Sequence, residues 1–591
     1  MVTKKSEGFG RIMESKKQII FGGGMLIGLF FFLTLYGVNV LDVTNDGWLL
    51  QGSDISQHYL GWVFYRRSPW YFPPGMMDNL FYPYLCSVIY TDSIPLFAFI
   101  FKVLSPVLPE TFQYFGLFGL FCFTMQGGFG ALLVGKLTEG IGDRCSLYCR
   151  SFLGAFFFLM ATPLLQRMYG DSYYTRHTAT AGQFVILAAF ALWAMKDTFI
   201  SLKKGCISWG MLAMVTALIH LNLVPMVFGI FLGYLFNRVL DEKKVIPSAY
   251  LLLSYVIMTI VPLFLMGAFY YPFHPEAGGL GFFTANLNAL WNPMGYSSVF
   301  QDLPVSSGQY EGMSYGGFGV LLLAAISFLL FGIHVGKRIK EKKGLKEFLA
   351  SIPAEKKRTG LSLLIVAISF CLLAVSTSIE FNEHVLLKIT LPDKLYQIFS
   401  MFRASGRFMW VDLYLLITAA IVLGAKYIES NGYIIFLYLC VAAQFFDLKY
   451  KLRDIQDNHK DKKEYVSEIL YSPIWEQIGE YYDYIMFMDS DTFVEVKGYW
   501  PGYDFQYAFA KLAADYGMAL NGFHVSRVYK FKEESDAEQW EKLERGEVMD
   551  NAVYIFEQSH LPKEKHLNFY IIDHIIIGTV QRLEGVPIYE F

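Results

Sequence analysis

The sequence predicts a helical protein that crosses a membrane many times and carries a small α/β domain at its C-terminus. Of its 591 residues, 54% are hydrophobic and only 17% are charged, a composition typical of multi-pass membrane proteins. Apolar runs of about 20 residues, the length needed to cross a bilayer, recur up to Phe446. The sequence then becomes polar and its hydrophobic pattern changes.

About eleven apolar runs are long enough to be considered as membrane spans. They cover residues 19–40, 112–136, 151–168, 181–200, 206–222, 224–238, 246–269, 316–335, 360–378, 409–427 and 431–446. The first run is long for a cleaved signal sequence, so we expect a retained span. The run 93–107 is short and contains Lys102, which indicates a helix lying on the membrane surface or, alternatively, a twelfth span. The runs 206–222 and 224–238 could instead form a broken or re-entrant pair.

Basic residues predict the orientation, because loops rich in Lys and Arg face the cytoplasm. The N-terminal segment and the block at 337–348 are basic, whereas the loop at 270–315 contains no Lys or Arg. These loops alternate correctly only if 93–107 lies on the surface. With the N-terminus in the cytoplasm and an odd number of spans, the C-terminal domain is expected on the extracytoplasmic side.

Two domains are therefore expected, a transmembrane domain at 1–446 and a soluble α/β domain at 447–591. In the second, short apolar runs predict strands and amphipathic runs predict helices. The expected strands are "YDYIMFM" (482–488), "AVYIF" (552–556) and "NFYIIDHIIIG" (568–578), and the expected helices are "YAFAKLAADYG" (507–517) and "AEQWEKLERG" (537–546).

Charged residues follow the first span in "GSDISQHYLGWVFYRRSPWYFPPG", residues 52–75. Asp54 and His58 are spaced to share one face of a short helix, which Pro69 should end. The alternative interpretation is an aromatic belt with solvated charges at the membrane interface.

Three further outward loops contain chemically active side chains. Asp171 and His177 lie in one, Glu311 lies beside a glycine-rich turn in the second, and Arg403 and Arg407 begin a helix in the third. Two guanidiniums at a helix N-terminus can bind a phosphate. The alternatives are that Glu311 is a solvated loop residue and that the arginines extend toward the membrane surface.

This pattern resembles the GT-C glycosyltransferases, multi-pass enzymes that take a sugar from a polyprenyl phosphate. Their shared mark is an acid in the first outward loop, here Asp54, followed by surface-lying helices with a "P-L" segment, here "YTDSIPLFAFIFK" (90–102). The whole chain also resembles a bacterial family of multi-pass proteins, through four motifs. These motifs are Asp54–Trp62, Tyr90–Leu96, Tyr310–Gly312 and Phe402–Phe408.

The resemblance implies an inverting transfer in which Asp54 is the general base. His58 or Asp92 would orient the acceptor or the base, and Arg403 and Arg407 would hold the donor phosphate. No cofactor is required, although some GT-C enzymes use a divalent ion, which Asp54 with Asp92 or Asp171 could bind. The scattered cysteines form no metal site.

The expected partners are a polyprenyl-phosphate sugar donor, an envelope glycan or lipid-linked acceptor, and the bilayer of a bacterial plasma membrane. A flippase and a donor synthase would supply the donor, and no nucleic acid is expected. The alternatives are a polymerase or ligase of lipid-linked oligosaccharides and a flippase or transporter of a lipid-linked sugar. Transporters usually carry charges inside their spans, whereas here the span interiors hold few charges and the candidate residues lie in loops. "MDSDTF" (488–493) matches a metal-binding D-x-D only weakly.

Overall fold

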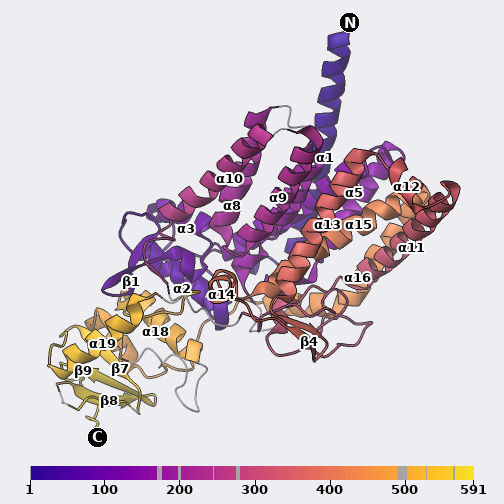
Figure 1. Cartoon of the computed structure of the whole chain (residues 1–591). Helices are drawn as coiled ribbons and strands as arrows, with labels where there is room; N and C mark the ends of the chain where they lie inside the picture. Colours follow the sequence, from indigo (N-terminus) through magenta and orange to yellow (C-terminus); the bar gives the residue numbers. More distant parts are fainter. Residues whose placement is uncertain are drawn as a thin grey trace. The chain divides into compact units, whose positions relative to one another are not determined.

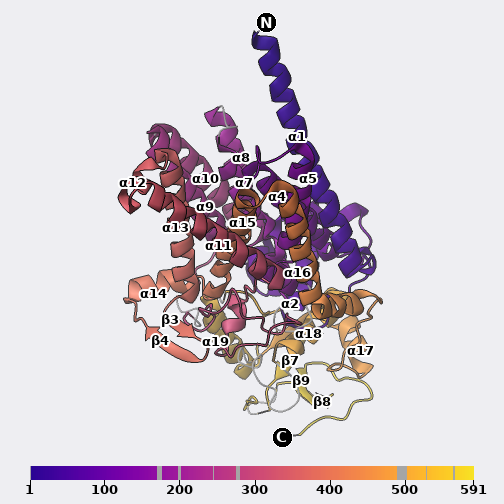
Figure 2. The same cartoon turned by 90° about the vertical axis from the view of Figure 1, so that its right-hand side faces the viewer.

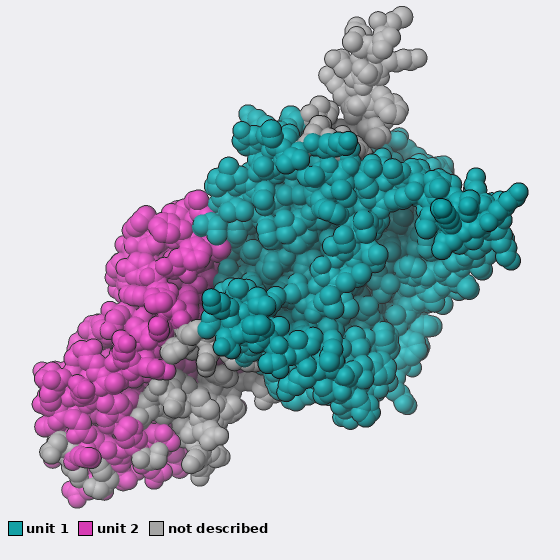
Figure 3. Space-filling model, in the orientation of Figure 1, with its two compact units in different colours: residues 1–41, 116–260, 276–461 teal, residues 42–115, 261–275, 462–591 magenta. Residues whose placement is uncertain are grey.

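The chain divides into two compact units in the computed structural model, which describes residues 2–168, 176–196, 201–243, 245–273, 280–488, 502–527, 529–558, 560–563 and 566–590. Unit 1 comprises residues 1–41, 116–260 and 276–461, and unit 2 comprises residues 42–115, 261–275 and 462–591 (Figure 3). The segment after the first span therefore belongs to the same unit as the C-terminal α/β domain. The expected domain boundary at residue 446 lies within a continuous helix, α16 (Ser430–His459).

The fold is that of a polytopic helical membrane protein, as the sequence predicts. Nine helices of the described residues are long and apolar enough to cross a membrane. They are α1 (Val2–Tyr36), α4 (Phe115–Leu137), α8 (Leu202–Ile219), α9 (Leu223–Glu242), α10 (Val245–Leu265), α11 (Phe318–Glu341), α13 (Ala354–Val375), α15 (Met409–Tyr427) and α16. The possible re-entrant pair at 206–238 is thus two helices of spanning length.

Two of the expected spans are shorter than predicted, which corrects the count from about eleven to nine in the described part of the chain. The run 151–168 is divided between α5 (Arg144–Leu159) and α6 (Thr162–Arg167). The chain turns at Ala161, whose extended backbone precedes a proline in the first turn of α6, where proline is favoured because it needs no N–H partner. The run 181–200 contains α7 (Phe184–Ala194), whose side chains are almost all buried.

The run 93–107 forms α3 (Pro95–Leu104) and a 3-10 turn. At 1.5 Å per residue, a ten-residue helix is about 15 Å long, half the thickness of the hydrocarbon core. The helix is therefore too short to be a span, as the surface interpretation requires.

The long helices of unit 1 form a bundle (Figures 1 and 2), in which small residues allow close packing. Helix α11 packs against α15 and α16, and α13 packs against α9. A Cβ atom on Gly319 of α11 would lie 2.1 Å from the backbone oxygen of Cys440 on α16. Close backbone approach at small residues is the common way in which membrane helices associate. A hairpin of β3 (Ser378–Phe381) and β4 (His384–Lys388) follows α13, and α14 (Asp393–Ser400) follows the hairpin (Figure 2).

Asp447 of α16 caps the N-terminus of α11. Its carboxylate accepts a hydrogen bond from the backbone N–H of Phe318 at 2.8 Å, from the hydroxyl of Tyr315 at 2.8 Å and from the hydroxyl of Ser297. Gln444, one turn earlier, accepts from the N–H of Val320 at 3.1 Å. A carboxylate at a helix N-terminus satisfies free N–H groups and interacts favourably with the helix dipole. These contacts join two spans.

Unit 2 contains a five-stranded mixed sheet of strand order β6-β5-β7-β9-β8. Strand β5 (Tyr484–Phe487) pairs in parallel with β6 (Ala519–Leu520) and β7 (Ala552–Phe556). Helices α18 (Gly502–Tyr516) and α19 (Phe531–Glu544) lie between these strands in the chain, as crossovers between parallel strands require. The predicted α/β domain and its two helices are confirmed.

The expected strand at 568–578 is instead a hairpin of β8 (Asn568–Ile572) and β9 (Ile575–Thr579), which pair antiparallel. Asp573 and His574 form the turn and both have positive φ, 50° and 68°. A two-residue turn with two positive φ angles matches the twist of a hairpin. Because the sequence is apolar on both sides of this turn, its pattern predicts one continuous strand. Residues 489–493 of the "MDSDTF" segment, which include both of its aspartates, lie outside the described residues.

The first segment of unit 2 contains helix α2 (Ser53–Arg67), a hairpin of β1 (Met76–Phe81) and β2 (Tyr84–Ser87), the 3-10 helix η2 (Val88–Thr91) and α3. Helix α2 ends before Ser68, whose extended backbone precedes Pro69, as predicted. It packs against α18 of the C-terminal domain. The backbone N–H of Tyr82 donates to the oxygen of Leu520 at 2.8 Å, so the hairpin joins the edge of the sheet.

We expect Asp447→Ala to lower the stability of the purified protein by about 3 kcal/mol, because it leaves buried donors without an acceptor. Thermal unfolding in detergent measures this effect. The matched control is Asp457→Ala on the same helix, whose exposed ion pairs with Arg453 and Lys460 should contribute less than about 1 kcal/mol. Equal unfolding temperatures for the two variants would contradict the capping role.

Candidate functional site

Two of the four sequence motifs meet in unit 1. Tyr310–Gly312 lies in the 3-10 helix η7 (Gln309–Gly312), and Phe402–Phe408 contains the 3-10 helix η8 (Ser405–Phe408). A Cβ atom on Gly406 would lie 2.8 Å from the backbone N and Cα of Gly312. Glycine is therefore required where these two segments cross.

Glu311 joins these segments to a third through a buried ion cluster with Arg167 and Arg407. One carboxylate oxygen lies 2.6 Å from Nη2 of Arg167 and 2.8 Å from Nε of Arg407, and the other lies 3.1 Å from Nη2 of Arg407. The Arg167, Glu311 and Arg407 side chains are 1%, 9% and 7% exposed. Arg407 thus binds the carboxylate with two nitrogens, the geometry for which a guanidinium is suited.

The charges around Glu311 keep it ionised despite its burial. Burial raises the pKa of the carboxyl, but Arg167 and Arg407, with a smaller contribution from His177, lower it well below the ordinary value of 4.5. The ring of His177 also packs edge-on against that of His220, with centroids 4.9 Å apart. The structure therefore brings together three of the predicted residues, namely His177, Glu311 and Arg407.

Arg403 does not join this cluster. Its side chain is exposed, and within the described part of the chain it forms no ion pair, while Arg407, four residues later, is buried on Glu311. The two arginines thus differ in what they can bind. Arg403 can approach a ligand directly, whereas Arg407 positions the Ser405–Phe408 turn through Glu311.

The other two motifs meet in unit 2. Asp54–Trp62 lies in α2, and Tyr90–Leu96 runs from η2 into α3. Ser93 donates its hydroxyl to the backbone oxygen of His58 at 2.7 Å. A Cβ atom on Gly61 would lie 2.4 Å from Cβ of Thr91, so a glycine is again required at the crossing.

This contact places Asp92 close to His58. A ring nitrogen of His58 and a carboxylate oxygen of Asp92 lie within 4.8 Å, and His58 is fully buried. Asp54 lies one turn earlier, in the first turn of α2, and is half-buried. An imidazole and a carboxylate at this separation can orient a neighbouring group or supply two ligands to a divalent cation. Asp171 lies outside the described residues.

Sequence reasoning missed Arg167 and His220. Arg167 lies at the end of a run interpreted as a span, and an arginine inside an apparent span is a functional signal by default. That signal was available from the sequence. His220 follows the last residue of α8 and showed no pattern that distinguishes it from other loop histidines.

A family model described as a domain of unknown function, DUF6311, matches residues 25–449, and the model of the DUF6311 C-terminal domain matches residues 474–580. No curated protein matches the chain.

Two solved structures of the oligosaccharyltransferase of Archaeoglobus fulgidus resemble it. The first, AglB in complex with an inhibitory peptide and a dolichol-phosphate, is 12% identical over 96% of this chain and 75% of that chain, with a TM-score of 0.39. The second, tethered to an acceptor peptide, is 13% identical over 97% and 75%, with a TM-score of 0.42. At these values neither likeness identifies a function.

We expect Glu311→Gln to destabilise the protein at neutral pH by about 3–5 kcal/mol, because it removes the negative charge that two buried guanidiniums share. The pKa of Glu311 is lower in the folded protein than the ordinary 4.5. Its stabilising contribution is therefore complete above pH 4.5 and is lost as the pH falls toward the lowered value. The difference in unfolding temperature between wild type and variant should accordingly narrow below pH 4.5.

The control for this experiment is Glu383→Gln, which changes an exposed acid in the β3–β4 turn and should leave the unfolding temperature unchanged. A Glu311→Gln variant as stable as this control at pH 7 would show that the ion cluster does not hold the three segments together.

Proposed function

The chain belongs to the DUF6311 family, and we propose that it is a membrane glycosyltransferase that moves a sugar from a polyprenyl phosphate to an extracytoplasmic acceptor. The acceptor is an envelope glycan or a lipid-linked glycan. The observation that carries this proposal is the pairing of the four sequence motifs. Segments far apart in the chain meet in two compact groups, and each group gathers charged or titratable side chains where helices end. Such convergence is typical of a catalytic site.

The distribution of charge favours an enzyme over a transporter. Asp54, His58 and Asp92 lie in short helices or the turns beside them, and Glu311 lies in the 3-10 helix η7. Arg407 lies at the beginning of the candidate span 405–427. Transporters of charged substrates usually place such groups at discontinuous helices near the middle of the membrane.

In the proposed reaction, Asp54 accepts the proton of an acceptor hydroxyl, whose oxygen attacks the anomeric carbon of the donor sugar. The bond from that carbon to the phosphate oxygen breaks, and the polyprenyl phosphate leaves with both bonding electrons. The configuration at the anomeric carbon is inverted. Asp54 is the candidate base because it is half-buried at the start of α2, whereas His58 is fully buried and, with Asp92, would orient the base or the acceptor.

The leaving phosphate carries negative charge that a guanidinium can neutralise. Arg403 is the candidate for this contact, because its side chain is exposed and outside the Glu311 cluster. Arg407 contributes to binding by fixing the turn that follows Arg403. His177 and Glu311 belong to the same buried cluster and support this part of the substrate site.

We expect Asp54→Asn to reduce transfer by about 10²–10⁴-fold, the usual contribution of a general base, without loss of folded protein. The assay uses purified protein, a panel of radiolabelled polyprenyl-phosphate hexoses, and envelope glycans extracted from a strain that lacks the gene. Asp550→Asn, a change at an exposed acid of the C-terminal domain, is the control and should retain activity. Wild-type activity in Asp54→Asn would exclude Asp54 as the base.

The reaction requires that the C-terminal domain face outward. A cysteine introduced at Lys460, an exposed residue just after α16, should react with a membrane-impermeant maleimide in intact cells. The native Cys145 is also exposed and lies in the first turn of α5, at an end of the helix expected to be cytoplasmic, so it should react only after lysis. The reverse pattern would place the domain in the cytoplasm and end the proposal.

A further inference from the structure

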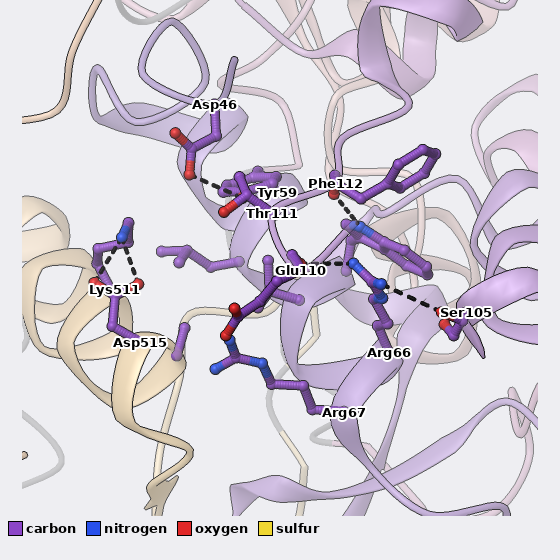
Figure 4. A pocket seen from close by; sticks show the side chains of 14 residues that line it. Asp46, Tyr59, Arg66, Arg67, Ser105, Glu110, Thr111, Phe112, Lys511 and Asp515 are labelled. Carbon is purple, nitrogen blue, oxygen red and sulfur yellow. Dashed lines mark hydrogen bonds and ion pairs between the residues drawn. The ribbon is translucent and has the colours of Figure 1, made fainter. Parts of the chain in front are cut away.

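Unit 2 contains a groove between α2 and α18 to which the proposed chemistry assigns no role. Two adjacent cavities, of 220 Å³ and 460 Å³, form it and share Arg67 of α2 and Ala514 of α18 in their walls. The first cavity is drawn in Figure 4, where Arg66 and Arg67 project from α2 and Lys511 and Asp515 from α18. Arg67 and Ala514 therefore border both cavities.

The groove is open because one wall lacks large side chains. Ala513, Ala514 and Gly517 line the second cavity along α18 and the turn that follows it. Aromatic rings also line the cavities, among them Tyr59 in the first cavity and Tyr71 in the second. The small side chains of α18 leave space for a ligand in the second cavity.

Carboxylates in the groove are held in fixed positions by neighbouring hydroxyls. Asp46 accepts from the hydroxyl of Tyr59 at 2.9 Å. Asp78 accepts from the hydroxyl of Tyr71 at 2.6 Å and from that of Ser68 at 2.8 Å. A carboxylate oxygen has further lone pairs and can accept hydrogen bonds from sugar hydroxyls, while an aromatic ring offers an apolar face. Each cavity thus contains a positioned acid beside an aromatic ring.

The two adjacent arginines of α2 have different environments. The Arg66 guanidinium donates to backbone oxygens of the loop after α3, including those of Glu110 and Pro109, each at 2.8 Å. Arg67 is exposed and, in the part of the chain that the structure describes, has no hydrogen bond or ion pair. The hydrogen bonds of Arg66 therefore hold the loop after α3, whereas the guanidinium of Arg67 lines both cavities.

We propose that this groove binds an anionic oligosaccharide, with one sugar in each cavity and the negative group of the ligand on Arg67. This inference rests on the proposed function and deepens it, because such a glycan would be the acceptor. The anionic group is a carboxylate or a phosphate, both of which a guanidinium binds with two parallel hydrogen bonds. The aromatic rings and the fixed acids Asp46 and Asp78 recognise the sugar rings.

The test measures binding of trigalacturonate, of a neutral trisaccharide of galactose, and of a phosphorylated mannose trisaccharide to the full-length protein in detergent, by saturation-transfer NMR and titration calorimetry. We expect an anionic ligand to bind at least about tenfold more tightly than the neutral one, since a charge-assisted hydrogen bond contributes more than a neutral one. The tighter binding of trigalacturonate would identify a carboxylate as the group bound by Arg67. The tighter binding of the phosphorylated trisaccharide would identify a phosphate.

Arg67→Gln should abolish this preference and weaken binding of the anionic ligand about tenfold or more. Arg545→Gln, which changes an exposed arginine of α19's C-terminal end, is the matched control and should leave binding unchanged. A second variant, Val63→Trp, fills the first cavity from α2 and should weaken binding of all three sugars. Binding of none of them, or binding that Arg67→Gln leaves unchanged, would overturn the inference.

The test separates this inference from the proposed function, because binding requires no transfer. Asp54→Asn should bind the anionic ligand as tightly as wild type. Suppose that Arg67→Gln loses binding of the anionic ligand and that the wild-type protein shows no transfer activity in any assay. This outcome would support the groove as a binding site and would reject the transfer reaction. Normal transfer to envelope glycans by Arg67→Gln would reject the groove as the acceptor site.

Discussion

The arrangement of unit 1 depends on one buried carboxylate. Glu311 is ion-paired to both Arg167 and Arg407, and the three side chains come from α6, η7 and η8. Two buried guanidiniums would repel each other and lose hydration without it. The carboxylate therefore fixes which connections meet, and the crossing of Gly312 and Gly406 follows from the short distance that it imposes. A charge cluster of this kind specifies one arrangement of loops above a helical bundle.

Much of the fold could be predicted from sequence, because the signals are local. The long apolar helices of the described residues, the end of α2 before Pro69 and the helices of the C-terminal domain all follow from runs, periodicities and prolines read along the chain. The errors have local causes too. The run 151–168 is apolar throughout and gives no sign of its turn at Ala161, because proline also occurs inside membrane helices. The turn at Asp573 and His574 does not contain the glycine that usually indicates a hairpin.

The individual residues of the candidate site could be predicted from the sequence, but the contacts between them could not. Glu311, Arg407 and His177 were identifiable as charged or titratable residues in outward loops. Their contacts join positions 96 residues apart in one case and 144 in the other, and one sequence contains no information on such distances. For the same reason Arg403 and Arg407 seemed equivalent from their spacing. Only the burial of one and the exposure of the other separates a side chain that supports the loop from one that can touch a ligand.

Unit 2 is assembled from three stretches of chain, 42–115, 261–275 and 462–591, and this has a consequence for biogenesis. A ribosome must translate on the order of 350 further residues after the first stretch before the third begins, which takes roughly 20–70 seconds at 5–20 residues per second. During that interval α2 and the β1–β2 hairpin lack the helix and the sheet edge against which they pack. The nascent chain therefore exposes apolar surface while later spans are still entering the bilayer, and a chaperone at the site of membrane insertion would have to protect it.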